Sequence, residues 1–302
     1  MSELTSGYLL VTGAATLWAM LVIFYHHLVG LYGIEPLQVA FLRAALSALI
    51  LGVALAIRQP AMLRVHRRDL PLFVAFGLLG VAAFFIVYVY AIRLTGGATA
   101  AVLMYTAPAW VTVIAWRAFD EPLSRTKLVA LGLSFVGCAL VARAYDLAQL
   151  RLDLVGIACG LASGLAYGLY TLFNKRAVQR YSPWTAMFYA LAFGGLFLAP
   201  WQSPARLWAA LSQPAAVLWL LALALGPTLG AYLLLGKSLE RLPASVVSIL
   251  ATSEPVIAAV VAWVFLQQAL EPIQIVGGCA VLIAVRLLQR STRPTTHNHS
   301  RR

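Results

Sequence analysis

A single acidic residue, Glu254, lies deep inside a long apolar segment. It is the only charged residue between Leu242 and Leu270, whereas the other nine acidic residues lie between apolar segments or at their ends. Inside a membrane span such a charge costs at least ~2.5 kcal/mol on insertion scales, so it indicates a functional site by default. We expect Glu254 either to exchange a proton or to bind the amine of a ligand. The alternative is a structural hydrogen bond or ion pair, for which Arg43 and Lys237 are the candidate partners.

Two further groups could act beside this carboxyl group. Arg43 interrupts the apolar segment Pro36–Ile57, where it could bind a carboxylate, tie helices together or extend toward the membrane surface. His26 and His27 lie near the end of the first apolar segment. Because histidine titrates near neutrality, His27 is a candidate proton relay, with a plain interfacial role as the alternative. Adjacent helical residues point in different directions and the three cysteines are scattered, so we expect no metal ion, no disulfide framework and no cofactor.

Two prolines lie in the middle of apolar segments. Pro108 and Pro255 each lack an N–H group, which frees the carbonyl groups of Met104 and Ala251 and is expected to bend the helix. Irregular backbone at membrane depth is tolerated where it lines a cavity or contacts other helices. We therefore predict that both prolines mark the walls of a central site, with a kink for packing alone as the alternative.

Aromatic residues are abundant and supply the rest of the predicted site. The chain has 8 Trp, 12 Tyr and 13 Phe residues. A cavity with aromatic walls and few charges suits flat, amphipathic or cationic molecules, and it suits phosphates poorly because these need Lys and Arg clusters. Each ring could instead belong to the core or face lipid. The rings predicted to line a cavity are Trp18, Phe84, Tyr88, Tyr105, Tyr167, Tyr170 and Tyr232.

One segment carries a stripe of small residues. Gly156, Gly160, Gly164 and Gly168 recur every four positions and therefore share one face of a helix. Such a stripe lets another helix approach closely, either within one chain or in a homodimer.

The elements that must position these residues are transmembrane helices. The chain has 302 residues, of which 62% are hydrophobic and 11% charged, against about 45–50% and about 25% in soluble domains. This composition excludes an ordinary soluble domain, a disordered chain and a disulfide scaffold. It predicts an all-α polytopic membrane protein with ten helices. We place them near residues 6–28, 36–57, 70–92, 97–116, 127–144, 154–174, 183–200, 214–236, 243–266 and 272–289.

The basic residues predict the orientation. Seventeen of the 22 lie in the even-numbered loops and the C-terminal tail, and four lie in the odd-numbered loops. By the positive-inside rule both termini face the cytoplasm. The net charge of +12 thus reports topology, and the expected partners are the lipid bilayer and a small molecule but no nucleic acid.

The two halves of the chain resemble one another. When Gly97–Leu123 is compared with Ala244–Leu270, Pro108 corresponds to Pro255, Trp116 to Trp263 and Glu121 to Gln268. Five helices per half is an odd number, so the second half must be inverted, as in secondary transporters. The predicted units are residues 1–148, residues 149–290 and a basic cytoplasmic tail at 291–302. Chance similarity between apolar segments is the alternative.

These motifs resemble those of the EamA-type drug/metabolite transporters. The resemblance rests on Trp18-Ala19 and Tyr167-Gly168 in the first helix of each half, on Thr106-Ala-Pro108 and Ser253-Glu-Pro255, and on Glu121 in the following loop. The second half departs from the last of these, with Gln268 or the displaced Glu271. The look is closest to bacterial exporters of aromatic amino acids and of compounds such as paraquat. The resemblance implies an inner-membrane exporter whose central cavity is lined by the first, third and fourth helices of each half.

The function predicted from the sequence is secondary export by alternating access. The expected substrates are small amphipathic metabolites, above all aromatic or neutral amino acids and toxic organic cations. An integral-membrane enzyme and a passive channel for small organic solutes are the alternatives. The enzyme is disfavoured because its chemistry normally needs clustered His, Asp or Glu residues.

Overall fold

The computed structural model describes residues 3–146 and 153–291, and over these residues it is helical throughout, with no strand. The predicted boundary between residues 148 and 149, Arg151, and Arg293, Arg301 and Arg302 of the predicted tail lie outside the described residues. Nine helical segments of the described part are long and apolar enough to cross a membrane. They are Glu3–Leu31, Pro36–Arg58, Arg67–Thr95, Gly97–Ala118, Leu154–Val178, Pro183–Trp201, Pro214–Arg241, Ala244–Leu266 and Pro272–Arg290.

Several of these segments are built from consecutive helical pieces. In chain order the pieces are α1 (Glu3–Ala19), α2 (Leu21–Tyr25) and the π-helical η1 (His26–Leu31); α3 (Pro36–Arg58); α4 (Leu70–Ala75), the π-helical η4 (Phe76–Ala83) and α5 (Phe84–Thr95); α6 (Gly97–Met104) and α7 (Ala107–Ala118); α8 (Arg125–Val141); α9 (Leu154–Val178); α10 (Pro183–Leu198); α12 (Pro214–Leu223), the π-helical η6 (Ala224–Gly230) and α13 (Ala231–Arg241); α14 (Ala244–Ala251) and α15 (Ser253–Leu266); and α16 (Pro272–Ser291). The connections contain η2 (Pro60–Leu63), η3 (Arg67–Asp69), η5 (Ala199–Trp201) and α11 (Pro204–Leu211).

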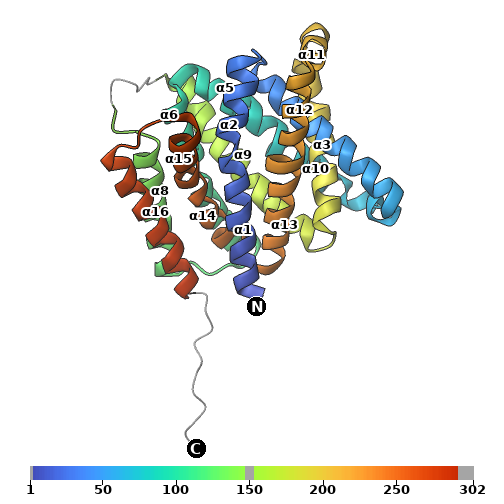
Figure 1. The fold of residues 1–302 in the computed structure, drawn as a ribbon. Coiled ribbons are helices and arrows are strands. Elements are labelled where there is room, and N and C mark those ends of the chain that lie inside the picture. The colour runs from blue at the N-terminus through green and yellow to red at the C-terminus, as the bar shows by residue number, and fades with distance from the viewer. Residues whose placement is uncertain (1–2, 147–152, 292–302) are drawn as a thin grey trace, which may run out of the picture.

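The contacts between loops sort them into two ends of the bundle. At one end Arg180 donates to Asp69 at 2.9 Å, and Arg241 donates to Ser6 at 3.1 Å. We call this end, which holds the even-numbered loops and the start of α1, the basic end; it is the lower end in Figure 1. At the other end Arg206 pairs with Glu35, from the seventh and first loops. We call it the opposite end.

Helix α8 supplies the tenth crossing. It has 17 residues, and it connects a loop at the basic end to a loop at the opposite end, where Arg143 pairs with Glu271. The helix stops at Val141, three residues before the end of the predicted segment near 127–144. Arg143 has a φ of 61°, in the left-handed region, and a residue in that conformation ends a helix.

The helices begin where the sequence offers caps. Ser124 and Asp153 accept hydrogen bonds from the backbone N–H groups two or three residues into α8 and α9, and Ser182 does the same for α10. These side chains satisfy N–H groups that have no partner within the helix. Pro36 and Pro214 occupy the first position of their helices, where a missing N–H group has no consequence. Local sequence thus fixes where the spans start.

The two halves of the chain pack into each other. Helix α3 lies along α10, α8 along α16, α1 along α13, and α5 along α9, so each of these pairs joins one half to the other. Figure 1 shows α8 with α16 at one side of the bundle and α3 with α10 at the other. At the α8–α16 contact, a Cβ added to Gly137 would lie 2.7 Å from the carbonyl oxygen of Gly277, and the reverse is also true. Only glycine permits this separation.

The expected proline bends are interruptions of the helix. In the first half α6 stops at Met104 and α7 starts at Ala107. The hydroxyl group of Thr106, in the gap, donates to the carbonyl oxygen of Leu103 at 2.6 Å. Pro108 therefore lies in the first turn of a new helix, where the first N–H groups are unpaired in any case.

The second half repeats this interruption. Helix α14 stops at Ala251 and α15 starts at Ser253. The hydroxyl group of Thr252 donates to the carbonyl oxygen of Ile249 at 2.6 Å, as Thr106 does to Leu103. Glu254 and Pro255 then fall in the first turn of α15. The matched prolines thus produce two matched helix breaks, one in each half.

Candidate functional site

A cavity of about 570 Å³ lies among helices of both halves. Its walls come from α1, α2, η1, α3, η4, α5, α6, α9, α13 and α15. Nine predicted site residues line it: Trp18, Arg43, Phe84, Tyr88, Tyr105, Tyr167, Tyr170, Tyr232 and Glu254. The others are Leu21, Val22, Tyr25, His26, Val29, Gly30, Pro36, Gly80, Phe85, Val89, Ile92 and Met104.

The cavity has its mouth at the opposite end. Its inner wall includes Arg43, whose side chain is 2% exposed, and the buried Tyr170. Its outer rim includes Ile92, which is 37% exposed, and the exposed residues His26 and Gly30. These rim residues flank the first and third loops, so the cavity opens toward the opposite end.

The aromatic wall is a connected set of rings. The ring of Trp18 packs edge-on against Tyr167, with centroids 6.2 Å apart, and against Tyr232 at 5.4 Å. Phe84 stacks on Tyr88 at 5.6 Å, and it also lies 5.6 Å from Tyr167. Rings from both halves therefore touch each other across the cavity. They offer faces and edges on which a flat or cationic solute can stack.

Arg43 is held in place by the second half. Its Nε donates to Thr228 Oγ1 at 2.9 Å, and its Nη2 donates to the carbonyl oxygen of Pro227 at 3.4 Å. The guanidinium carbon lies 5.7 Å from the ring centroid of Phe85 and 6.0 Å from that of Tyr232. Two hydrogen bonds and two rings therefore fix its position. Phe85 was not among the predicted residues, although it follows Phe84 directly in the sequence.

Glu254 faces the cavity without a partner. Within the described ranges its carboxyl group forms no hydrogen bond and no ion pair within 4.0 Å. The structure does not bring Lys237 to it, because the Lys237 ammonium lies 5.8 Å from the ring centroid of Trp184, away from the cavity lining. A lone carboxyl group in such a place is available to a proton or to the cation of a solute.

The two histidines take different positions. His27 does not line the cavity: its ring stacks on Trp219 at 4.2 Å, and its Nδ1 lies 2.9 Å from the carbonyl oxygen of Ile23. His26 lines the mouth instead. Adjacent positions on a helix point apart, and the sequence offered no signal for which of the two faces inward.

The prolines and the glycine stripe lie behind the wall. Pro108 and Pro255 are not part of the lining. The glycine stripe of α9 receives the broken helix of the first half: Gly160 lies against Leu103, Gly164 against the carbonyl oxygen of Leu103, and Gly168 against Ala107. A Cβ at Gly164 would come within 2.8 Å of that oxygen. The stripe, which also includes Gly156, is thus filled by the same chain.

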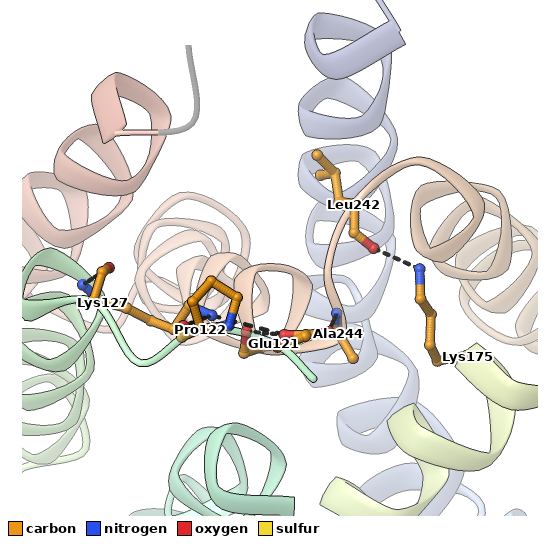
Figure 2. A network of polar contacts seen from close by, with 8 residues as sticks. Glu121, Pro122, Lys127, Lys175, Leu242 and Ala244 are labelled. Carbon is orange, nitrogen blue, oxygen red and sulfur yellow. Dashed lines mark hydrogen bonds and ion pairs between the residues drawn. The ribbon is translucent and has the colours of Figure 1, made fainter. Parts of the chain in front are cut away.

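A buried carboxylate, Glu121, links chain segments at the basic end. This side chain, 7% exposed, accepts hydrogen bonds from the backbone N–H groups of Ala244 at 2.6 Å and Ser245 at 3.2 Å, and from the Ser245 hydroxyl group. It therefore caps the start of α14. Lys127 lies 3.8 Å from Glu121 and donates to the carbonyl oxygen of Pro122 at 2.8 Å. Figure 2 shows Glu121 between Lys127 and Ala244.

A second lysine ties the neighbouring helix to the same loop. The ammonium group of Lys175, in α9, donates to the carbonyl oxygens of Leu239 at 2.5 Å and Leu242 at 3.0 Å. Figure 2 shows the contact with Leu242 beside the Glu121 cluster. Leu242 also packs against Gly7 of α1, where a Cβ would come within 2.7 Å of its side chain. We call Glu121, Lys127, Lys175, Leu242 and Ser245 the basic-end latch. From the sequence, Glu121 is expected to lie in a loop, and its contacts with the start of α14 are not predicted.

The remaining candidate chemistry is sparse. Within the described ranges no three His, Cys, Asp or Glu residues come together as a metal site would require. Cys138, Cys159 and Cys279 are free thiols.

Comparison with known proteins assigns the family. The sequence pattern of the EamA-like transporter family matches residues 5–143 and again residues 154–290. The chain belongs to this family. It therefore contains two EamA repeats, and the cavity of this EamA-like transporter lies where they meet.

Its relatives are transporters rather than enzymes. An uncharacterized transporter of Archaeoglobus fulgidus is 30% identical over 217 residues, which cover 70% of this chain and 76% of that protein. A probable terminal-alkyne amino-acid exporter of Streptantibioticus cattleyicolor is 26% identical over 263 residues, covering 86% of each chain. One crystal structure matches with a TM-score of 0.79 over 96% of this chain and 99% of the other, at 16% identity, and so shares the fold. The molecule is a multi-pass membrane transporter that carries a small molecule.

Proposed function

We propose that this EamA-like transporter is a secondary exporter of small amphipathic metabolites. The favoured substrates are aromatic and other neutral amino acids and toxic organic cations. The observation that carries the proposal is the cavity itself: a wall of aromatic rings from both repeats, with one carboxyl group and one guanidinium group. The probable terminal-alkyne amino-acid exporter among its relatives supports amino acids as the substrate class.

The proposed mechanism is alternating access. The cavity has a mouth at the opposite end, and the latch closes the basic end. The excess of Lys and Arg in the even-numbered loops supports a cytoplasmic location for the basic end and both termini. The structure then corresponds to the outward-open state in a bacterial inner membrane. Export requires the repeats, residues 1–148 and 149–290, to rock so that the latch opens and the mouth closes.

Glu254 is the proposed coupling group. In the outward-open state a proton from outside neutralises the carboxylate, which weakens its attraction for the cationic part of the solute and releases the solute. In the inward-open state the proton leaves to the cytoplasm, and the charged carboxylate binds the next solute. Each cycle exchanges one proton for one solute, which makes the protein an antiporter.

Flux into liposomes tests the proposal. The purified protein is reconstituted, and uptake of labelled L-phenylalanine, L-tryptophan, L-isoleucine and paraquat is measured with and without a pH gradient. We expect saturable flux of at least one solute that the gradient accelerates. Fast, non-saturable flux would indicate a channel, and no flux of any of the four would refute the substrate assignment.

A further inference from the structure

The cavity contains two groups of opposite charge that do not pair with each other. Arg43 comes from α3 in the first repeat, and Glu254 comes from α15 in the second. Both line the cavity, yet the separation exceeds the 4.0 Å of an ion pair. Two charges that share a poorly solvated cavity would ordinarily pair. Each charge is therefore open to a group of a bound solute.

The guanidinium group is fixed by one edge and free at the other. Its Nε and Nη2 are engaged by Thr228 and Pro227, whereas Nη1 has no hydrogen-bond partner in the described part of the chain. Phe85 and Tyr232 limit its rotation. A planar guanidinium anchored in this way presents its remaining donors in a set direction, which suits a carboxylate.

The carboxyl group is the complementary half of the site. Glu254 has no partner of its own within the described ranges, and the rings around it include Tyr88, Tyr105 and Tyr167. Aromatic faces attract cations, so the surroundings of Glu254 favour an ammonium group as well. Arg43 can thus bind a negative group of a solute, and Glu254 can bind a positive one.

We propose that Arg43 and Glu254 together recognise a zwitterion. The carboxylate of an amino acid binds the free edge of Arg43, its ammonium group faces Glu254, and its side chain lies against the aromatic rings. This inference rests on the proposed function and narrows it. Amino acids are the substrate class, and simple organic cations are poor ligands because they leave the buried Arg43 charge beside another positive charge.

The first experiment uses the unmodified protein. Binding of labelled L-phenylalanine in liposomes is competed with unlabelled L-phenylalanine, with phenethylamine, which lacks the carboxylate, and with 3-phenylpropionate, which lacks the ammonium group. Because each analogue leaves one buried charge unmatched, we expect both to compete at least about ten-fold more weakly than L-phenylalanine. Equal competition by either analogue would overturn the proposal.

Variants then assign each charge to its partner. We expect R43M and R43K to weaken binding of L-phenylalanine by about ten-fold or more. R43M should bind phenethylamine at least as tightly as the unmodified protein does. E254Q is expected to weaken binding of L-phenylalanine and phenethylamine, the two ligands with an ammonium group. Binding of 3-phenylpropionate should be unchanged. K237M removes a cation that lies outside the cavity and serves as the matched control, with no change for any ligand.

The pattern separates recognition from a structural role. If Arg43 only tied α3 to η6, R43M would weaken all three ligands equally, which would overturn the proposal. Should a variant fail to fold, the competition with the unmodified protein still decides. Failure of the proposed function looks different, because then L-phenylalanine, tryptophan, isoleucine and paraquat all show no flux. Flux without discrimination between L-phenylalanine and its analogues would refute the zwitterion site alone.

Discussion

The two broken helices share a backbone and differ in charge. In both, a threonine in the gap donates to the carbonyl oxygen three residues earlier, and a proline follows in the next turn. The first-repeat break presents the buried Ala107 to the glycine stripe of α9. The second-repeat break presents Glu254, at the matching position, to the cavity. The break therefore forms both with and without a carboxyl group at this position, so the charge is not needed to form it.

The loops after the broken helices show the reverse distribution. Glu121 follows the first and caps the start of α14 at the basic end. Its counterpart Gln268 follows the second; it is exposed, and its side chain forms no hydrogen bond in the described part of the molecule. Glu121 thus binds the start of a helix at the basic end, whereas Gln268 makes no such contact and the displaced Glu271 pairs with Arg143 at the opposite end. We expect this difference to favour closure of the basic end.

Replacement of the central carboxyl group has the largest expected effect. We expect E254Q to abolish flux driven by a pH gradient, because an amide cannot exchange a proton, and to leave solute exchange measurable. The measurement is uptake of labelled L-phenylalanine into liposomes, with an imposed pH gradient or with unlabelled amino acid inside.

The control for this experiment lies in the other repeat. A107S changes the matching position without removing an ionisable group and should retain gradient-driven flux. If E254Q shows gradient-driven flux at the rate of the unmodified protein, Glu254 is structural. The difference between Glu254 and Ala107 would then play no part in proton coupling.

Disruption of the latch has an intermediate effect. E121Q removes the negative charge that faces Lys127 and the start of α14. A carboxylate at a helix start contributes about 0.3–1 kcal/mol, and more when partly buried. Breaking a buried ion pair adds up to about 3–5 kcal/mol. We expect a lower melting temperature and an open basic end. Ser248 is buried in α14, the helix that Glu121 caps, so opening should appear as faster maleimide labelling of S248C in a background free of native cysteines.

Gln268 supplies the matched control, since Q268A changes the corresponding loop at the opposite end without touching the latch. Labelling of S248C should then stay at the rate of the unmodified protein. If E121Q and Q268A label alike, Glu121 does not hold the basic end closed, and the asymmetry between the two ends has another cause.

The sequence predicts much of the fold and of the cavity, for identifiable reasons. Apolar segments and basic loops are local signals, and they place the ten helices to within a few residues. The seven rings predicted to line a cavity all reach it. The prolines were expected to bend their helices, because a sequence alone does not distinguish a kink from a restart at the proline. In the structure a threonine hydroxyl group in each gap donates to a carbonyl oxygen at the end of the preceding helix.

Contacts between distant segments were beyond the sequence. Nothing near Glu121 in the chain indicates that it caps a helix 123 residues later. The anchors of Arg43 lie at Pro227 and Thr228, again in the other half. Lys237 was a plausible partner for Glu254 by charge alone, and the packing of α13 turns it toward Trp184. The side on which a residue emerges from its helix decides these contacts.

The smallest expected effect comes from making the two ends alike. Q268E gives the opposite end the carboxylate that Glu121 supplies at the basic end. If the repeats use the same latch in turn, the inward-open state brings residue 268 to the start of α6, as Glu121 meets α14 now.

A carboxylate at a helix start contributes about 0.3–1 kcal/mol, so Q268E should shift the equilibrium toward the inward-open state by about two- to five-fold. External maleimide labelling of G30C at the mouth should slow by at most that factor, which is reached when the inward-open state predominates, whereas Q268N should leave the rate unchanged. An unchanged labelling rate in Q268E would mean that the opposite end closes by contacts of a different kind. The inverted repeats would then share a backbone arrangement, but different contacts would close the two ends of the cavity.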